Sequence, residues 1–238
     1  MPAPCPGQAN MRIFDTNIWH RIVYTLGAPT YNILTRGFRR KRRRSIELAA
    51  IRPGERVLLV GAGTGLDLDF IPRETRITAI DITPAMLLRL RRRARRLGLA
   101  VDARVMDGRA MAFPDGAFDV VILHLILSVI PEPLQCAKEV GRVLRKGGRA
   151  VILDKFVPDE GKAPLFNRIL NPVAAFFGTR LDRRLGPLLA AAGLRMVCQK
   201  NAMMAGFFKI TCAEKSILDT EDAASIILRC TTKYRSEP

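Results

Sequence analysis

The sequence predicts an α/β fold in which a mostly parallel sheet carries helices on both faces. Short apolar segments alternate with helical stretches after Pro53 and Gly54, and these segments are apolar throughout, as in strands buried on both sides. The last two strand-like segments are separated only by a short turn, which indicates an antiparallel pair. With 238 residues, 48% hydrophobic and 26% charged, the chain can bury a sizeable core, and neither disorder nor a fibrous repeat fits.

Residues 1–50 are expected to form a helical extension that precedes the main domain, residues 51–238. Apolar positions between Ile18 and Leu26 form one stripe of a helix that begins near Asn17 and ends at Gly27. A second helix is predicted over Tyr31–Ala50, with the basic run Arg36–Arg44 on its exposed face. An apolar stripe next to cationic charge suits either a lid on the site or contact with an anionic membrane.

The main domain is expected to alternate strands and helices in a regular order. Five strands are predicted at Arg56–Val60, Ile77–Ile80, Val101–Met106, Val120–Leu127 and Ala150–Leu153. Two helices are predicted between them, at Thr83–Leu97 with Thr83 as the cap, and at Pro133–Leu144.

The last third of the chain begins with an apolar and basic segment, 156–185, which we expect to be a helical insert. A helix near Leu185–Ala192 should end at Gly193. Two strands, Leu194–Lys200 and Phe207–Cys212, then form the antiparallel hairpin.

The net charge of +17 has two interpretations. It can reflect a general bias of composition toward arginine, or attraction to an anionic partner. Five cysteines without C-x-x-C spacing and two histidines far apart suggest no disulfide framework and no metal site. No segment is apolar for the roughly 20 residues that a spanning helix needs, and no secretory signal is visible, so we expect a cytoplasmic protein.

The clearest motif is V-L-L-V-G-A-G-T-G-L-D, a buried strand that runs into a glycine-rich turn at residues 57–67. Glycines there let a ligand approach the backbone, and the helix expected next would present its N-terminal amides. The spacing is G-x-G-x-G, not the G-x-G-x-x-G typical of dinucleotide folds. A plain tight turn is the alternative.

Two acidic residues follow the next two strands. Asp81 ends the second strand, where a carboxylate could accept both ribose hydroxyls of an adenosine, or could instead cap the following helix. Asp107 ends the third strand and could accept an adenine amino group, or could be a turn residue. Asp119 opens the fourth strand at the opposite edge, which predicts a structural role.

Together these motifs resemble the class I S-adenosylmethionine-dependent methyltransferases. The resemblance rests on the G-A-G-T-G turn, Asp81, Asp107, F-D-V-V-I-L-H and L-R-K-G-G-R, and covers about residues 54–212. It implies a Rossmann-like seven-stranded sheet with an antiparallel final hairpin. It also implies S-adenosylmethionine as cofactor, bound by Gly61, Ala62, Gly63, Asp81, Ile82, Met86, Asp107, Gly108, Leu123 and His124.

The acceptor is expected to be lipophilic. The stretches 28–35, 127–133 and 154–164 resemble bacterial phosphatidylethanolamine N-methyltransferases and the related ubiquinone and menaquinone C-methyltransferases. The first implies a phospholipid acceptor and a peripheral membrane location; the second leaves a quinone precursor as the alternative. The Asn/Asp-Pro-Pro-aromatic motif of amino-group methyltransferases that act on nucleic acid bases is missing after the fourth strand, so no nucleic acid partner is expected.

Tyr31 and His124 are the residues predicted to lie beside the transferred methyl group. They would hydrogen-bond an acceptor amine and help remove its proton, and the ordinary histidine pKa near 6.5 suits that role. Packing against the cofactor without proton chemistry is the alternative for both. A scaffold that binds the cofactor without transferring methyl, and a nicotinamide oxidoreductase, are further hypotheses; the second conflicts with the glycine spacing.

Overall fold

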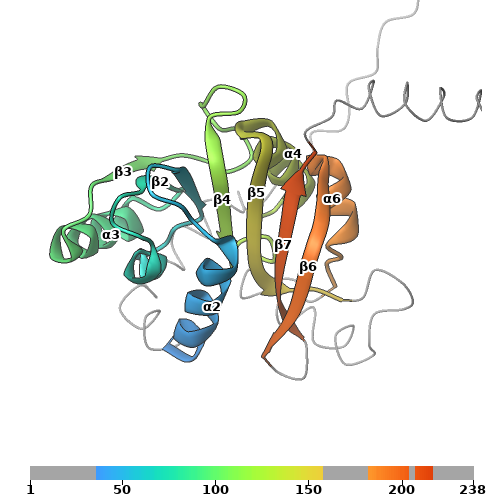
Figure 1. Cartoon of the computed structure of the whole chain (residues 1–238), viewed down its shortest axis with the longest axis horizontal. Helices are drawn as coiled ribbons and strands as arrows, with labels where there is room; N and C mark the ends of the chain where they lie inside the picture. Colours follow the sequence, from blue (N-terminus) through green and yellow to red (C-terminus); the bar gives the residue numbers. More distant parts are fainter. Residues whose placement is uncertain (1–35, 158–181, 204–206, 217–238) are drawn as a thin grey trace, which may run out of the picture.

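Seven strands form one sheet in the order β3-β2-β1-β4-β5-β7-β6 (Figure 1). The computed structural model describes residues 36–157, 182–203 and 207–216. The strands are β1 (Arg56–Val60), β2 (Arg76–Asp81), β3 (Val101–Val105), β4 (Phe118–His124), β5 (Leu144–Lys155), β6 (Leu194–Met203) and β7 (Phe208–Lys215). All neighbours are parallel except the two pairs that involve β7, which confirms the mostly parallel sheet with an antiparallel final hairpin.

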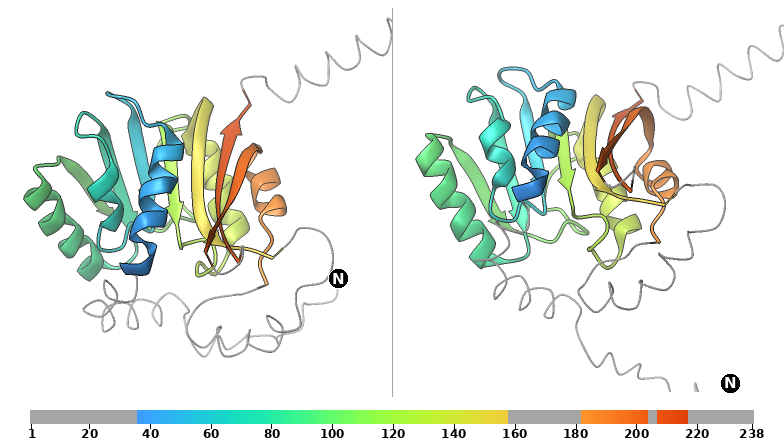
Figure 2. Two further views of the ribbon diagram at one scale, coloured as in Figure 1. Left: turned by 60° about the horizontal axis from the view of Figure 1, so that its bottom comes forward. Right: turned by 90° about the horizontal axis from the view of Figure 1, so that it is seen from below.

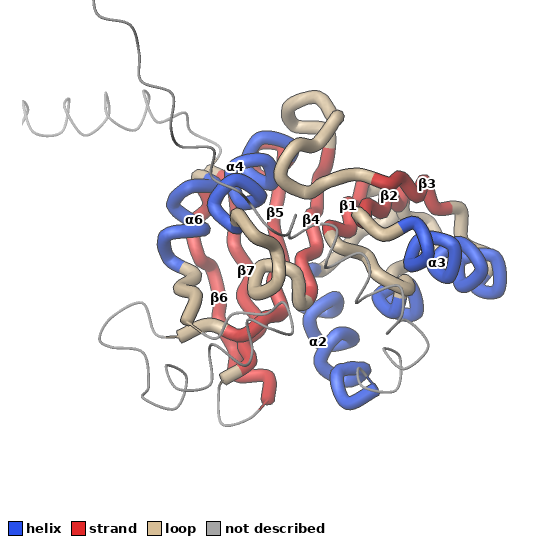
Figure 3. Tube along the Cα trace, turned by 180° about the vertical axis from the view of Figure 1, so that it is seen from behind, coloured by secondary structure: helices blue, strands red, loops and turns tan. Residues whose placement is uncertain are grey.

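Helices cover both faces of this sheet (Figure 2). The helical elements are η1 (Arg36–Phe38), α2 (Arg39–Ala49), η2 (Leu66–Phe70), α3 (Pro84–Leu97), α4 (Pro133–Val143) and α6 (Gly186–Ala192). Helices α2 and α3 lie on one face, and α4 and α6 lie on the other, in front of the strands in Figure 3. Each face therefore has its own buried apolar cluster.

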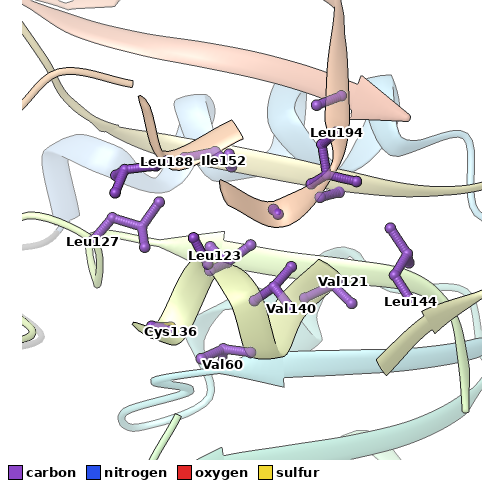
Figure 4. Close-up of a cluster of buried hydrophobic side chains, with 14 of the residues drawn as sticks. Val60, Val121, Leu123, Leu127, Cys136, Val140, Leu144, Ile152, Leu188 and Leu194 are labelled. Atoms are coloured by element: carbon purple, nitrogen blue, oxygen red, sulfur yellow. The ribbon is translucent and has the colours of Figure 1, made fainter. Parts of the chain in front are cut away.

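Strand β4 supplies both clusters because successive side chains point to opposite faces. Val121 and Leu123 belong to the cluster under α4 and α6, where Leu123 lies among Val140 and Leu188 (Figure 4). Ile122 belongs to the cluster under α2 and α3. The same alternation turns the next side chain, that of His124, toward α2.

Strands β6 and β7 each end three residues later than predicted, and four further sequence predictions need correction. Strand β4 ends at His124 rather than Leu127, because Leu125 adopts a left-handed backbone with φ of 61° and turns the chain. Strand β5 begins at Leu144, six residues before the predicted start, and Leu144 pairs with Phe118 across a bulge.

The two other corrections concern helices. The turn at residues 61–65 leads only into the five-residue 3-10 helix η2, because Pro72 forces Ile71 into an extended conformation. Four arginines of the basic run are exposed on α2 as expected, but Lys41 is half-buried and Arg42 is buried.

Several predictions lie outside the described residues. These are the helix near 17–26, the start of the second helix at 31–35, and residues 158–181 of the insert. Among the residues that the structure describes, no helix is long and apolar enough to cross a membrane.

Candidate active site

A cleft opens at the carboxyl ends of β1, β2 and β4. The strand order reverses between β1 and β4, and ligands of open α/β sheets bind outside the carboxyl ends at such a point. Its walls come from the glycine-rich turn, the ends of β2 and β4, and the apolar segment that follows β4. The motifs picked out in the sequence therefore meet at one site.

The glycine-rich turn forms one wall, and its shape requires glycine. Gly61, Gly63 and Gly65 have φ of 65°, 54° and 77°, a left-handed conformation that a side chain disfavours. A Cβ atom on Gly61 would lie 2.6 Å from Cδ1 of Ile126, which also lines the cleft. Ala62 is buried and its N–H donates to the Ile80 carbonyl, so it supports the turn from behind rather than lining the cleft.

Asp81 lies at the end of β2 with its carboxylate fixed in the cleft. It accepts hydrogen bonds from the N–H groups of Gly63 at 2.9 Å and Thr83 at 2.8 Å. Burial raises the pKa of Asp81, although these two donors act in the opposite direction. Thr83 is the N-cap of α3, but its side chain makes no capping hydrogen bond. Asp81 thus fixes the turn and still has acceptor capacity for a ligand.

Asp107 also lines the cleft, but it already has a cationic partner. Its oxygens accept from the Arg109 side chain, with a shortest distance of 2.7 Å, and Arg109 also approaches Glu132 at 3.4 Å. Burial alone would raise the pKa of Asp107, but Arg109 outweighs it and lowers the pKa. Sequence reasoning missed Arg109, although an arginine two residues after an acid is a visible signal.

His124 lies at the end of β4, where its ring joins the cleft to α2. Its Nδ1 is 2.8 Å from Oδ1 of Asp67, and its Nε2 is 2.8 Å from Oγ of Ser45. Arg42, one turn before Ser45 on α2, donates to both Asp67 oxygens at 2.8 Å. Both ring nitrogens therefore have protein partners.

Most of the predicted cofactor residues come together at the cleft. Those that line it are Gly61, Gly63, Asp81, Ile82, Met86, Asp107, Gly108 and His124. Ala62 and Leu123 do not, since Leu123 points into the core on the opposite face of β4. Tyr31 lies outside the described residues. Asp119 sits at the far edge and accepts from Arg56 and Arg145, as its predicted structural role requires.

The apolar wall of the cleft was not predicted as part of the site. It consists of Leu125, Ile126, Val129, Ile130 and Pro131. The run after His124 has the composition of a strand, so only the turn at Leu125 reveals that it leaves the sheet.

Comparison with known proteins shows to which family this chain belongs. A methyltransferase domain family matches residues 58–152. The phosphatidylethanolamine N-methyltransferase of Cereibacter sphaeroides is 36% identical over 157 residues, 65% of this chain and 77% of the relative. The demethylmenaquinone methyltransferase of Thermus thermophilus is 33% identical over 169 residues, 67% and 76% of the two chains. The chain belongs to the class I S-adenosylmethionine-dependent methyltransferases.

Solved structures agree with this methyltransferase fold. A geranyl diphosphate methyltransferase in complex with S-adenosylmethionine has a TM-score of 0.61 at 17% identity, covering 73% of this chain and 85% of its own. The cyclase SpnF has a TM-score of 0.71 at 19% identity, covering 85% and 97%. At such low identity these likenesses show the fold alone.

The cleft of this methyltransferase fits S-adenosylmethionine. Asp81 offers a partly buried carboxylate whose unused acceptor sites suit a pair of ribose hydroxyls. Ile82 and Met86 line the cleft beside it with apolar surface for an adenine ring, while the turn at Gly61 and Gly63 brings bare backbone to the opposite side. The enzyme therefore uses S-adenosylmethionine as its cofactor.

Proposed function

We propose that this methyltransferase transfers methyl groups to the amino head group of phosphatidylethanolamine, toward phosphatidylcholine, at a membrane surface. The observation that carries the proposal is the similarity to the Cereibacter phosphatidylethanolamine N-methyltransferase, which extends over 77% of that protein. The lipophilic acceptor predicted from the sequence agrees with it.

The residues of the cleft support methyl transfer by direct displacement. This reaction requires mainly that the acceptor be aligned with the methyl group and that water be excluded. When bound, the cofactor supplies an electrophilic methyl group on a sulfonium. Asp81 would hold the ribose, and the half-buried or buried side chains of Ile126, Val129 and Ile130 would keep water away from the reacting end. The amine must lose its ammonium proton before it attacks. Proton acceptance by Tyr31, or by water that it positions, stays a prediction.

Helix α2 supports contact with an anionic surface. Its connection to β1 is only residues 50–55, so α2 runs back along the sheet and its first turn lies at the edge where the cleft opens. Arg39 packs over the Phe70 ring at 5.2 Å and is 68% exposed at its side chain. The exposed arginines of this helix are Arg39, Arg40, Arg43 and Arg44.

The acceptor is tested by transfer of labelled methyl from S-adenosylmethionine, using the full chain. Three acceptors are compared: vesicles with phosphatidylethanolamine, vesicles without it, and a demethylated quinol in detergent. We expect label in mono-, di- or trimethylated head groups only with the first. Label in the quinol alone would replace the proposal with the alternative.

Membrane contact is tested with two matched pairs of substitutions. Each basic residue near an anionic surface contributes about 1 kcal/mol, so Arg40→Gln with Arg44→Gln should weaken vesicle binding by roughly 30-fold. The control, Arg92→Gln with Arg96→Gln, removes the same charge from exposed positions of α3. Equal losses in both pairs would indicate attraction by net charge, without a contact face on α2.

A quinone precursor is the second candidate, because the Thermus demethylmenaquinone methyltransferase is similar over 76% of its length. Carbon methylation of a ring would require no anionic membrane. Activity that is independent of anionic lipid, with a quinol as acceptor, would favour this candidate.

A further inference from the structure

Four polar side chains form a continuous buried chain between α2 and the cleft. They run from Arg42 through Asp67 and His124 to Ser45, with every link at 2.8 Å. The side chains of Arg42 and Asp67 are each 6% exposed, that of His124 is 1% exposed, and Ser45 is fully buried. Three distant segments contribute, namely α2, the end of the glycine-rich motif, and the end of β4.

The charge on Asp67 fixes the positions of the protons in this set of four hydrogen-bonded side chains. Burial alone would raise the pKa of Asp67, but the attraction of Arg42 and His124 and their hydrogen bonds hold it well below its usual range. An ionised carboxylate only accepts, so Nδ1 of His124 carries a proton. In the neutral ring Nε2 then accepts from the Ser45 hydroxyl. Neither ring nitrogen is left to take a proton from an acceptor in the cleft.

We propose that Asp67 is a positioning residue for the cofactor cleft. It acts through His124, whose ring it holds in one tautomer and one orientation as part of the cleft wall. Because the same carboxylate neutralises Arg42, this wall takes its shape only when α2 is seated on the sheet. The position of α2 is thereby coupled to cofactor binding. This proposal depends on the family's cofactor and is independent of the acceptor proposed above.

Two other roles for these four buried side chains fit the structure less well. The order Ser45, His124, Asp67 has the connectivity of a nucleophilic triad, but Ser45 has no exposed surface from which to attack a substrate. A purely stabilising role is also unconvincing, since buried ion pairs can often be replaced by apolar residues without loss of stability. That property provides the test.

The decisive variant replaces the ion pair with apolar side chains, Arg42→Met with Asp67→Leu. It removes both buried charges together, so α2 should stay docked, while His124 loses the acceptor at Nδ1. The matched control is Arg93→Met with Asp69→Leu. Asp69 lies two residues further along η2, pairs with Arg93 of α3 at 2.8 Å and lies 3.9 Å from exposed Arg39. Like the decisive pair it does not line the cleft, but it has no contact with His124 in the described structure.

Binding of S-adenosylhomocysteine, measured by calorimetry, is the first readout and needs no acceptor. We expect the decisive variant to bind about tenfold more weakly than the wild type, with the control within about twofold. Ser45→Ala, a gentle change inside a helix, should weaken binding by less. If the double variant does not fold, this single variant keeps the test open: unchanged affinity in it would then overturn the proposal.

The tautomer of His124 is the second readout, observed by nitrogen-15 NMR. The chain has only two histidines, so His20→Gln assigns the signals. We expect a single form protonated at Nδ1 in the wild type and its loss in Arg42→Met with Asp67→Leu. Wild-type affinity in that folded variant, or an equal loss in the control, would overturn the proposal. A wild-type chain that does not bind S-adenosylhomocysteine would remove its premise, whereas failure to methylate phospholipid would leave it intact.

Discussion

The close approach of Gly61 and Ile126 leads to a prediction in which one added carbon atom changes the cleft. In Gly61→Ala, the new Cβ would lie 2.6 Å from Cδ1 and 2.8 Å from Cγ1 of Ile126. The φ of 65° costs alanine about 1 kcal/mol, and an Ile126 side chain displaced from its rotamer costs about another. We therefore expect Gly61→Ala to lower the free energy of unfolding by about 2 kcal/mol.

A double-mutant cycle separates these two contributions. In the Ile126→Ala background Cδ1 and Cγ1 are gone and only the Cβ of residue 126 remains, at 3.1 Å, so Gly61→Ala should cost little more than the backbone part, about 1 kcal/mol. Urea unfolding of the four proteins gives the coupling. Because the displaced Ile126 lines the cleft, S-adenosylhomocysteine should also bind at least about tenfold more weakly to the single Gly61→Ala variant. Additive unfolding energies, or unchanged affinity, would contradict a collision between residues 61 and 126.

Three further predictions test the helix packing and the carboxylates. Gly141→Ala should lower the free energy of unfolding, measured in urea, by about 1–3 kcal/mol, because the new Cβ would lie 2.0 Å from the Ala192 carbonyl oxygen of α6. This cost should exceed the gain from the better helix propensity of alanine. A more stable variant would contradict this packing. Affinity for S-adenosylhomocysteine should fall as the pH drops through the raised pKa of Asp81, where its carboxylate is protonated, and affinity that is flat from about pH 7 to about pH 4 would contradict its role. Burial alone would raise the pKa of Asp119, but Arg56 and Arg145 outweigh it and lower the pKa. Asp119 therefore stabilises the fold above its unfolded pKa of about 3.9 and loses this effect as the pH falls through its folded pKa. The difference in unfolding free energy between wild type and Asp119→Asn should therefore shrink in acid, and a constant difference would argue against the ion pairs.

The centre of the sheet was predictable because β1, β2 and β4 are short, largely apolar and flanked by turns. Strand β1 has the predicted bounds, Arg56–Val60, since four consecutive apolar residues follow Arg56 and the run ends at Gly61. The reversed β7 followed from a connection too short for a helix. The same reasoning placed Asp81 in the cleft, because a polar residue at the end of a buried parallel strand lies at the ligand edge.

Features that depend on distant pairing could not be predicted in this way. Arg42 sits in a run of similar arginines, and only its partner Asp67, 25 residues away, distinguishes it. The segment after His124 is as apolar as the strand itself, so its departure from the sheet depends on the left-handed Leu125, a conformation that no leucine prefers. Both features belong to the site, where the structure that function requires differs from the one that the local sequence favours.

We propose that this methyltransferase acts on phosphatidylethanolamine, and analysis of the lipids of a cell that produces it tests this claim. The full chain would be produced in a bacterial host whose membrane contains phosphatidylethanolamine but no phosphatidylcholine, with Asp81→Ala as the control. Mass spectrometry of extracted lipids should show head groups heavier by one, two or three methyl groups with the wild type, and none with the control. Unmethylated lipid in cells that contain folded wild-type protein able to bind S-adenosylhomocysteine would contradict the claim.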